Sequence, residues 1–242
     1  MKKKDVKQRK AWFRAYKKLM HGRYKKTNFI YIGEQFKDGS FIVSNHEGTD
    51  APMALEIWLN KRITMLGASE MNSGFKAMYK YQTRIYYHEK KGWNLHLARA
   101  FCLLATPLTN LFYKGLNLIS TYRDARFFTT IKLCIEAIKD GSSLAIFPED
   151  SKEGYKPQLD GLHKGFLLIL ETASKKNMDI PVVISYFNIK TNTYIFDDPI
   201  LYSELLQKYE KRENISNYIL NRINELGRMT FESTDNSSKG GC

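Results

Sequence analysis

The chain has 242 residues, of which 43% are apolar, and its formal net charge at pH 7 is +13. This length and apolar fraction predict one α/β domain with a substantial core, rather than two small domains. The cysteines Cys102, Cys134 and Cys242 are odd in number and lack CxxC or Cys/His metal-binding spacing. The sequence therefore argues against a disulfide framework and indicates free thiols in a reducing, cytoplasmic compartment.

Almost all of the positive charge lies in residues 1–26, which contain nine Lys, three Arg and one Asp and carry +11, leaving +2 for the rest. In a helical segment, Trp12, Phe13, Tyr16 and Leu19 would fall on one side among basic residues. This composition predicts an amphipathic helix that lies on an anionic membrane surface, and the dense charge predicts no secretory signal peptide. The alternatives are nucleic-acid binding and a solvated tail whose aromatics pack on the domain; we expect no nucleic-acid partner.

The rest of the chain alternates β-prone runs with helical periodicity, which is typical of an α/β fold with a mixed central sheet flanked by helices. Residues 53–114 are rich in Met, Tyr and Trp and mostly helical in pattern, with breaks expected at three glycines and at Pro107. The longest apolar run, residues 101–113, contains Pro107 and falls short of a membrane-spanning helix. We therefore expect no transmembrane segment.

The predicted domain covers residues 27–230, and a polar tail at 231–242 is expected to be disordered. Residues 116–147 have the pattern of a βαβ unit. The expected strands cover residues 28–32, 41–44, 116–121, 143–147, 181–187 and 193–196. The expected helices cover residues 53–60, 125–139, 164–175 and, as one or two helices, 203–229.

Residues 44–52, Ser-Asn-His-Glu-Gly-Thr-Asp-Ala-Pro, form the first block with a chemical signature. His46 follows an apolar run and precedes a helix-like stretch, so we expect it at the C-terminal end of a buried strand, where open α/β sheets bind ligands. A histidine there can take a proton from a hydroxyl when a carboxylate orients it, and Asp50 is the nearest candidate. Alternatively, His46 is an ordinary loop histidine and Asp50 only caps the helix, with Pro52 in its first turn.

Three further blocks follow in order: Arg123 after a β-prone run, Phe-Pro-Glu-Asp-Ser-Lys at 147–152 with a Lys-Gly pair at the next helix start, and Ile-Pro-Val-Val at 180–183. With these four blocks, the chain resembles the glycerolipid acyltransferase superfamily of 1-acyl-glycerol-3-phosphate and glycerol-3-phosphate acyltransferases over most of residues 28–200. The corresponding family blocks are Asn-His-x-x-x-x-Asp, an arginine shortly before a helix, Phe-Pro-Glu-Gly-Thr-Arg and an Ile-Pro-Val strand.

The first block departs from the family pattern in its spacing. Three residues separate His46 from Asp50 where the family usually has four, so the loop between them must be tighter. Gly48 makes such a loop possible, because glycine tolerates backbone angles that are closed to other residues. Glu47 remains the alternative carboxylate partner of His46.

Two other departures concern the substrate side. Asp150 and Lys152 stand where the family has Gly and Arg, and lysine lacks the planar fork that pairs with phosphate. Phosphate affinity or headgroup choice is therefore expected to differ. His46 and Arg123 lie 77 positions apart, which is long for the family and implies an inserted helical lobe at about residues 60–114 that shapes the acceptor or acyl pocket.

The resemblance implies O-acyl transfer from an acyl thioester, acyl-CoA or acyl carrier protein, to a hydroxyl of a glycerol-phosphate-type lipid, with lysophosphatidic acid favoured. The histidine would act as general base, so that no cysteine nucleophile is needed, and basic residues would hold the acceptor phosphate. The implied site residues are His46 and Asp50 for catalysis, and Arg123, Glu149, Ser151 and Lys152 for substrate binding.

No spacing of His, Cys, Asp and Glu matches a metal-ligand set, so we expect no metal and no cofactor beyond the acyl donor. Among the other histidines, His163 is the one positioned by sequence to line the same cleft. The sequence thus predicts a cytoplasmic acyltransferase bound peripherally to the inner face of a membrane. The alternatives are an acyltransferase for another lipid alcohol and a catalytically impaired protein that binds lipid surfaces.

Overall fold

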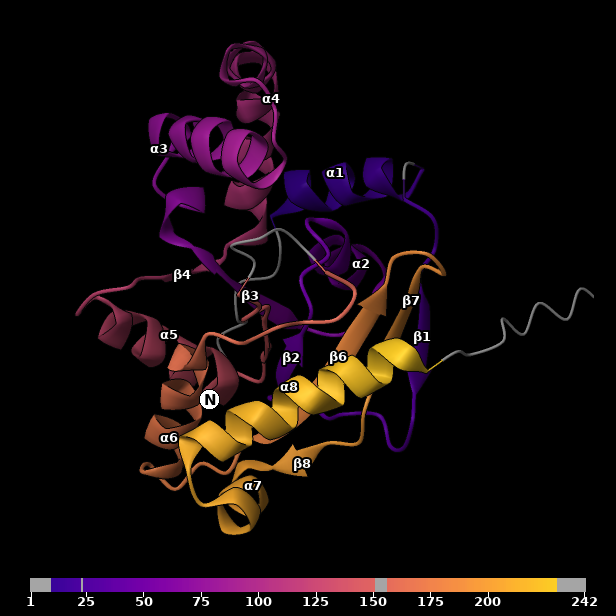
Figure 1. Ribbon diagram of the computed structural model, residues 1–242, viewed down its shortest axis with the longest axis vertical. Helices are drawn as coiled ribbons and strands as arrows, with labels where there is room; N and C mark the ends of the chain where they lie inside the picture. The colour runs from indigo at the N-terminus through magenta and orange to yellow at the C-terminus, as the bar shows by residue number, and fades with distance from the viewer. Residues whose placement is uncertain (1–9, 23, 151–155, 230–242) are drawn as a thin grey trace, which may run out of the picture.

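The computed structural model describes residues 10–22, 24–150 and 156–229, which form an α/β fold around one mixed sheet (Figure 1). The strand order is β1-β7-β6-β2-β5-β3-β4, and β8 also pairs with β6. β7 and β8 run antiparallel to β6, while the other neighbours are parallel. The strands are β1 (Asn28–Tyr31), β2 (Phe41–Ser44), β3 (Ile63–Ala68), β4 (Ile119–Thr121), β5 (Ser143–Ile146), β6 (Pro181–Asn188), β7 (Thr193–Phe196) and β8 (Ile200–Leu201).

Helices cover both faces of the sheet. They are α1 (Ala11–His21), α2 (Asp50–Trp58), α3 (Phe75–Tyr81), the π-helix η2 (Gln82–Lys90), α4 (Leu95–Leu116), α5 (Phe127–Lys139), α6 (Leu167–Ser174), α7 (Tyr202–Tyr209) and α8 (Arg212–Arg228), with short 3-10 turns η1 (Ser69–Met71) and η3 (Lys164–Phe166). One core cluster joins α5, α6, α7 and α8 to the sheet, and a second joins α2 to the other face. Because both faces are covered, the central strands are continuous apolar runs.

The six strands expected from the sequence are present, and so are the helices expected around them. The prediction of helix across most of residues 53–114 is wrong for β3, which lies between β5 and β4. Met65 and Leu66 of this strand are buried. A short apolar run of this kind cannot be assigned to strand or helix by its periodicity alone. The helical lobe expected at about residues 60–114 therefore starts only after this strand.

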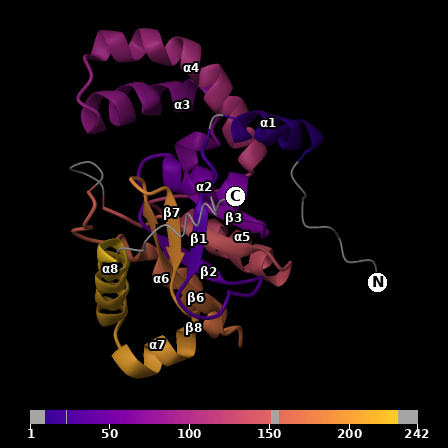
Figure 2. The ribbon, with the colours of Figure 1, turned by 90° about the vertical axis from the view of Figure 1, so that its right-hand side faces the viewer.

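Residues 75–116, comprising α3, η2 and α4, form a helical lobe at one end of the molecule, opposite α7 (Figures 1 and 2). Inside the lobe, the buried Thr106 hydroxyl of α4 donates a hydrogen bond of 2.9 Å to the Gln82 side chain of η2. Aromatic rings add to this packing, because the Phe101 ring centroid lies 5.1 Å from Tyr87 and 5.4 Å from Trp93. The lobe thus has an interior of its own.

The expected break at Pro107 is wrong, since α4 continues through it for 22 residues. Proline removes one backbone hydrogen bond and typically bends a helix, and α4 bends along its length (Figure 2). Within the described residues, α4 is the helix that is long and apolar enough to cross a membrane, judged by length and composition. Only 17% of its most apolar window is buried in the protein.

The basic N-terminal segment contains the predicted helix, α1, which packs on the protein. Phe13 is fully buried, and its ring lies 5.8 Å from that of Phe112 in α4. It also occupies the space beside Gly115, where an added Cβ would come within 1.9 Å of the Phe13 ring. Trp12 and Leu19 remain exposed. Residues 1–9 and the predicted disordered tail at 231–242 lie outside the described residues.

Further contacts tie α1 to α2. The Lys17 ammonium lies 3.1 Å from the buried Glu56 carboxylate, and the His21 ring stacks on Trp58 with 4.5 Å between centroids. These contacts match the alternative in which aromatics of the basic segment pack on the domain. A membrane contact of α1 therefore has to use Trp12, Leu19 and the remaining basic side chains.

Phe13→Ala should lower the free energy of unfolding by about 3 kcal/mol, because it removes a fully buried ring and leaves a cavity beside Gly115. Leu19→Ala is the matched control on the same helix, since Leu19 is 75% exposed, and it should change stability by less than about 0.5 kcal/mol. Chemical denaturation measures both values. Equal losses for the two variants would contradict the packing of α1 described above.

Candidate active site

The candidate site lies where the parallel strands β2, β5 and β4 end at one edge of the sheet. β2 is fully buried, and His46 follows two residues after its end, as the sequence predicts. β5 is the direct parallel neighbour of β2, so Glu149, just beyond β5, reaches the same place. β4 lies two strands beyond β5 in the sheet, and Arg123 follows its end. Ligands bind at this edge of open α/β sheets.

Asn45 fixes the backbone immediately before His46. Its buried side-chain amide donates a hydrogen bond of 3.0 Å to the Phe187 carbonyl and accepts one of 2.7 Å from the Phe187 N–H. The amide thus satisfies both backbone groups of a residue in β6, as a neighbouring strand would. Asn45 belongs to the first family block, which implies no role for its side chain. The structure shows that it anchors the end of β2.

Glu149 joins the first block to the third. Its Oε2 accepts a hydrogen bond of 2.9 Å from the backbone N–H of His46, and the residue is only 8% exposed. The third block is held in turn from the other side, where the His163 N–H donates to the Pro148 carbonyl at 2.7 Å. The His163 imidazole Nε2 lies 3.8 Å from Asp150 Oδ1, so this histidine borders the site. This geometry supports a bracing role for Glu149, whereas its expected part in substrate binding stays a prediction.

The tight loop expected after His46 is present. Glu47 and Gly48 both have left-handed backbone angles, with φ of 40° and 65°. Such an angle is uncommon for a residue with a Cβ, which makes Glu47 the strained position of the loop. Asp50 then begins α2 as its first helical residue, and Thr49 occupies the capping position. The alternative in which Asp50 caps this helix is therefore wrong, whereas its pairing with His46 stays a prediction.

Two lysines that the sequence analysis did not single out reach the site from the lobe. Burial lowers the pKa of Lys90, and the nearby charges of Glu149 and Asp150 act in the opposite direction. Burial raises the pKa of the Asp50 carboxyl, and the charge of Lys91 opposes this rise. The two lysines follow one another at the end of η2, and π-helices often mark functional sites. Nothing in the local sequence indicates that this basic pair faces the first block.

The His46 imidazole is uncharged at neutral pH. Burial lowers the pKa of His46 to about 4, the charge of Lys90 lowers it further, and backbone contact with Gly48 acts against both. Its ring centroid lies 5.3 Å from that of Phe147, which adds an apolar wall. Burial also raises the pKa of Glu149. A neutral imidazole can accept a proton, but one with so low a pKa needs a nearby negative charge to support the imidazolium.

The other predicted residues are placed less fully. Arg123 is exposed, and its charge is near enough to Lys90 to lower the pKa of that lysine, with burial as the larger cause. Ser151 and Lys152, which were expected to bind substrate, lie outside the described residues. Within the described part of the chain, no group of three or more His, Cys, Asp or Glu side chains is placed to hold a metal ion.

A cavity of about 370 Å³ lies beside Asp50. Trp58 and Phe187 contribute apolar walls, while Lys25 and Asn192 contribute polar ones. Phe187 is also the residue to which Asn45 is bonded, so the cavity and the His46 block share a wall. Its mixed lining suits a small ligand with both a polar and an apolar part.

The chain matches no protein-family model, and comparisons with curated proteins and with solved structures likewise find no match. The relation to acyltransferases therefore remains the resemblance carried by the four sequence blocks.

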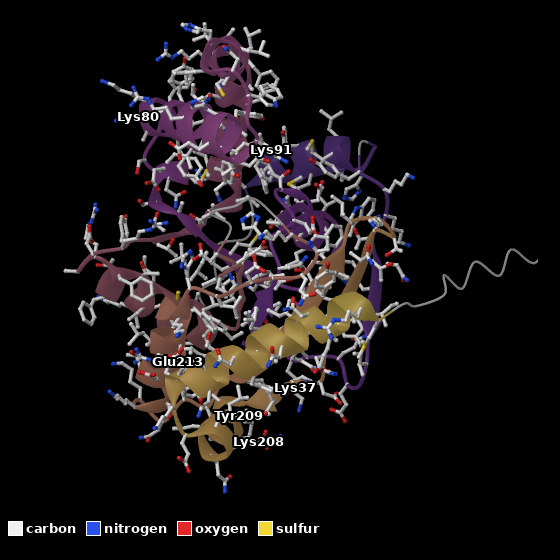
Figure 3. All side chains as sticks on the ribbon, in the orientation of Figure 1. Lys37, Lys80, Lys91, Lys208, Tyr209 and Glu213 are labelled. Carbon is white, nitrogen blue, oxygen red and sulfur yellow. The ribbon has the colours of Figure 1, made fainter. Side chains whose placement is uncertain are left out.

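Lys90→Met should raise the pKa of His46 above about 4, because it removes a positive charge that disfavours the imidazolium. An NMR titration of the His46 ring resonance, assigned with His46→Gln, measures this shift. Lys80→Met is the matched control, since Lys80 belongs to the same lobe (Figure 3) and does not act on His46. The placement of Lys90 is wrong if the two lysine variants titrate alike.

Proposed function

We propose that the chain is an O-acyltransferase that moves a fatty acyl group from a thioester to a hydroxyl of a glycerol-phosphate-type lipid, with lysophosphatidic acid as the favoured acceptor. The observation that carries the proposal is the neutral His46 at the ligand-binding edge of the sheet, braced by Glu149 and bordered by the lobe lysine Lys90. The four sequence blocks supply the reaction class by resemblance.

In the proposed reaction, the acceptor oxygen attacks the thioester carbonyl carbon while the His46 imidazole takes the hydroxyl proton. The resulting tetrahedral intermediate collapses as the carbon–sulfur bond breaks. The sulfur leaves as a thiolate, and the His46 imidazolium then gives it the proton. The acceptor thus becomes an ester, the donor becomes a free thiol, and His46 returns to its neutral form. No covalent intermediate with the protein is required.

The described cysteines are unsuited to act as nucleophiles. Burial raises the pKa of Cys134 to about 12 and also raises the pKa of Cys102. Both side chains are fully buried. A thiolate is the reactive form, so these thiols fit a core role better than a catalytic one.

Because the pKa of His46 is low, the charge of the bound acceptor would help His46 to act as a base. A phosphate bound near Lys90 would offset the positive charge that disfavours the imidazolium, and a carboxylate from Asp50 or Glu47 would add to this effect. Binding of a phosphorylated acceptor would therefore raise the pKa of His46 toward the range useful for a base. A neutral alcohol would not provide this support, which favours a phosphorylated acceptor.

The proposal includes a site for each substrate part. Arg123, Lys152 and the newly assigned Lys90 would hold the acceptor phosphate, with Ser151 and Glu149 alongside. The helical lobe, as an insertion in the acyltransferase fold, would form a wall of the lipid pocket. The donor would be acyl-CoA or acyl carrier protein, and the protein would work peripherally at the cytoplasmic face of a membrane. No cofactor beyond the donor is invoked.

Two alternatives remain, an acyltransferase for another lipid alcohol and a catalytically impaired lipid-binding protein. Release of free thiol from acyl-CoA or acyl carrier protein distinguishes them when lysophosphatidic acid and lysophosphatidylcholine are supplied in parallel. Thiol release with lysophosphatidic acid alone supports the proposal. Release with another alcohol favours the first alternative, and membrane binding without release from any acceptor favours the second.

His46→Ala should lower acyl transfer by about 10²–10⁴-fold while the circular dichroism spectrum stays unchanged, because it removes the general base. His96→Ala is the matched control, since His96 is an exposed histidine at the start of α4. Near-full turnover by His46→Ala would show that His46 is not the general base.

The carboxylate partner can be identified with two isosteric changes. Asp50→Asn should reduce turnover less than His46→Ala does but more than Glu47→Gln, because Asp50 occupies the position of the family aspartate. The rate constant kcat at saturating acceptor is the measurement. If Glu47→Gln is the more damaging of the two, the orienting role belongs to Glu47.

Arg123→Ala and Lys152→Ala should raise KM for the phosphorylated acceptor about tenfold or more, with little change in KM for the acyl donor. Lys152→Arg should preserve activity, because the guanidinium fork suits phosphate. Arg126→Ala is the control, since Arg126 is exposed and paired with Asp124 at 2.7 Å. Equal increases in KM for both substrates would place Arg123 and Lys152 outside the acceptor site.

A further inference from the structure

α4 presents an apolar face to the outside of the molecule. At 3.6 residues per turn, its exposed large residues gather on one side of the helix, and the exposed Ala100 and Pro107 extend the same side. The large residues are Leu97, Phe101, Leu103, Leu104, Leu108 and Leu111, which are between 42% and 79% exposed.

The opposite side of α4 is the one that packs. Ala98, Cys102 and Thr106 are fully buried, and Thr106 is bonded to η2. The helix therefore has one side that faces the protein and, in addition, an apolar side that the described part of the chain leaves largely exposed, with Phe101 at its edge in contact with Tyr87 and Trp93. A contiguous apolar patch of this kind marks an interaction surface.

The charge of the lobe indicates what covers this face. Residues 75–116 contain seven Lys or Arg and one acidic residue, a net charge of +6. Residues 1–26 carry +11, so the remainder of the chain carries −4. The two basic segments meet in the fold, because Phe13 of α1 packs against Gly115 of α4. Figures 1 and 2 show α1 and the lobe at the same end of the molecule. Among the described residues, both combine basic residues with exposed apolar side chains.

We propose that the exposed face of α4, with α1 beside it, docks the protein on an anionic membrane surface. Apolar side chains flanked by lysine and arginine are the combination that binds such an interface. A second copy of the chain is the less favourable occupant, because two basic lobes would then face each other.

The helix lies on the membrane instead of crossing it. Thr106 ties the middle of α4 to η2, Gly115 packs on α1 near the end of the helix, and this C-terminal end leads within three residues into β4 of the sheet. A single spanning helix would expose all of its sides to lipid, whereas the side of α4 that carries Ala98, Cys102 and Thr106 is buried against the protein.

This docking deepens the proposed function and rests on it for its purpose. The lobe that carries the apolar face also carries Lys90, which borders His46. A lipid acceptor would therefore reach the site from the membrane that the lobe contacts. Vesicle binding is measured without turnover, so the docking surface and the acyltransferase can fail separately.

The experiment compares Leu104→Glu/Leu108→Glu with the unchanged full-length protein in co-sedimentation with phosphatidylcholine vesicles, with and without phosphatidylglycerol. The unchanged protein should bind the anionic vesicles, and the double variant should bind about tenfold or more weakly, since two apolar contacts become like-charged with the lipid. Phe128→Glu is the matched control, because Phe128 is 78% exposed on α5 and should have no effect.

Leu104→Ser/Leu108→Ser removes the apolar contacts without adding charge and should also weaken binding, while thermal melting verifies the fold of each variant. Anionic-vesicle binding by both double variants at the level of the unchanged protein would overturn the proposal. Light scattering measures the oligomeric state of each protein. If the unchanged protein is a dimer and the double variants are monomers, the face binds a second copy of the chain instead. Turnover of a soluble short-chain acceptor should persist in both double variants, and its absence from the unchanged protein would count against the acyltransferase alone.

Discussion

The Asn45 amide pairs with both backbone groups of Phe187 and so extends the contact between β2 and β6 beyond Ser44, where β2 ends. The next residue, His46, is then held from the other neighbouring strand, because its N–H donates to Glu149. These bonds fix the backbone at the position of the histidine, while the left-handed loop that follows sets where the chain goes next. These hydrogen bonds of Asn45 and His46, together called the clamp below, therefore set the distances between His46 and the residues around it.

The clamp places an imidazole and a carboxyl together in a half-buried site, and burial disfavours the charged form of each. Burial lowers the pKa of His46 to about 4 and raises that of Glu149. The positive charge of Lys90, which belongs to the lobe, lowers the pKa of His46 and also lowers the pKa of Glu149. The lobe therefore sets part of the electrostatics of the candidate site, and this effect depends on the packing of α4 on η2.

The features that local sequence patterns determine could be predicted from the sequence. The strand before His46, the strand before Glu149 and the tight loop at Gly48 follow from apolar runs and glycine chemistry, and all three are present. Prediction from the sequence failed where tertiary context decides. β3 was predicted as helix because its strand character comes from its two neighbours in the sheet. Pro107 was predicted to break a helix that packing sustains, and the reach of Lys90 to the site depends on a π-helix that no local pattern specifies.

The lobe also separates two kinds of surface. The sheet and its covering helices are close to neutral or acidic, whereas the lobe and the N-terminal segment hold the excess of positive charge. Charge of one sign at one end gives the molecule a preferred orientation toward an anionic surface before any contact forms. The exposed apolar side chains on α4 would then stabilise the docked state, because their transfer out of water is favourable. Orientation and docking would therefore use the same element that supplies Lys90 to the candidate site.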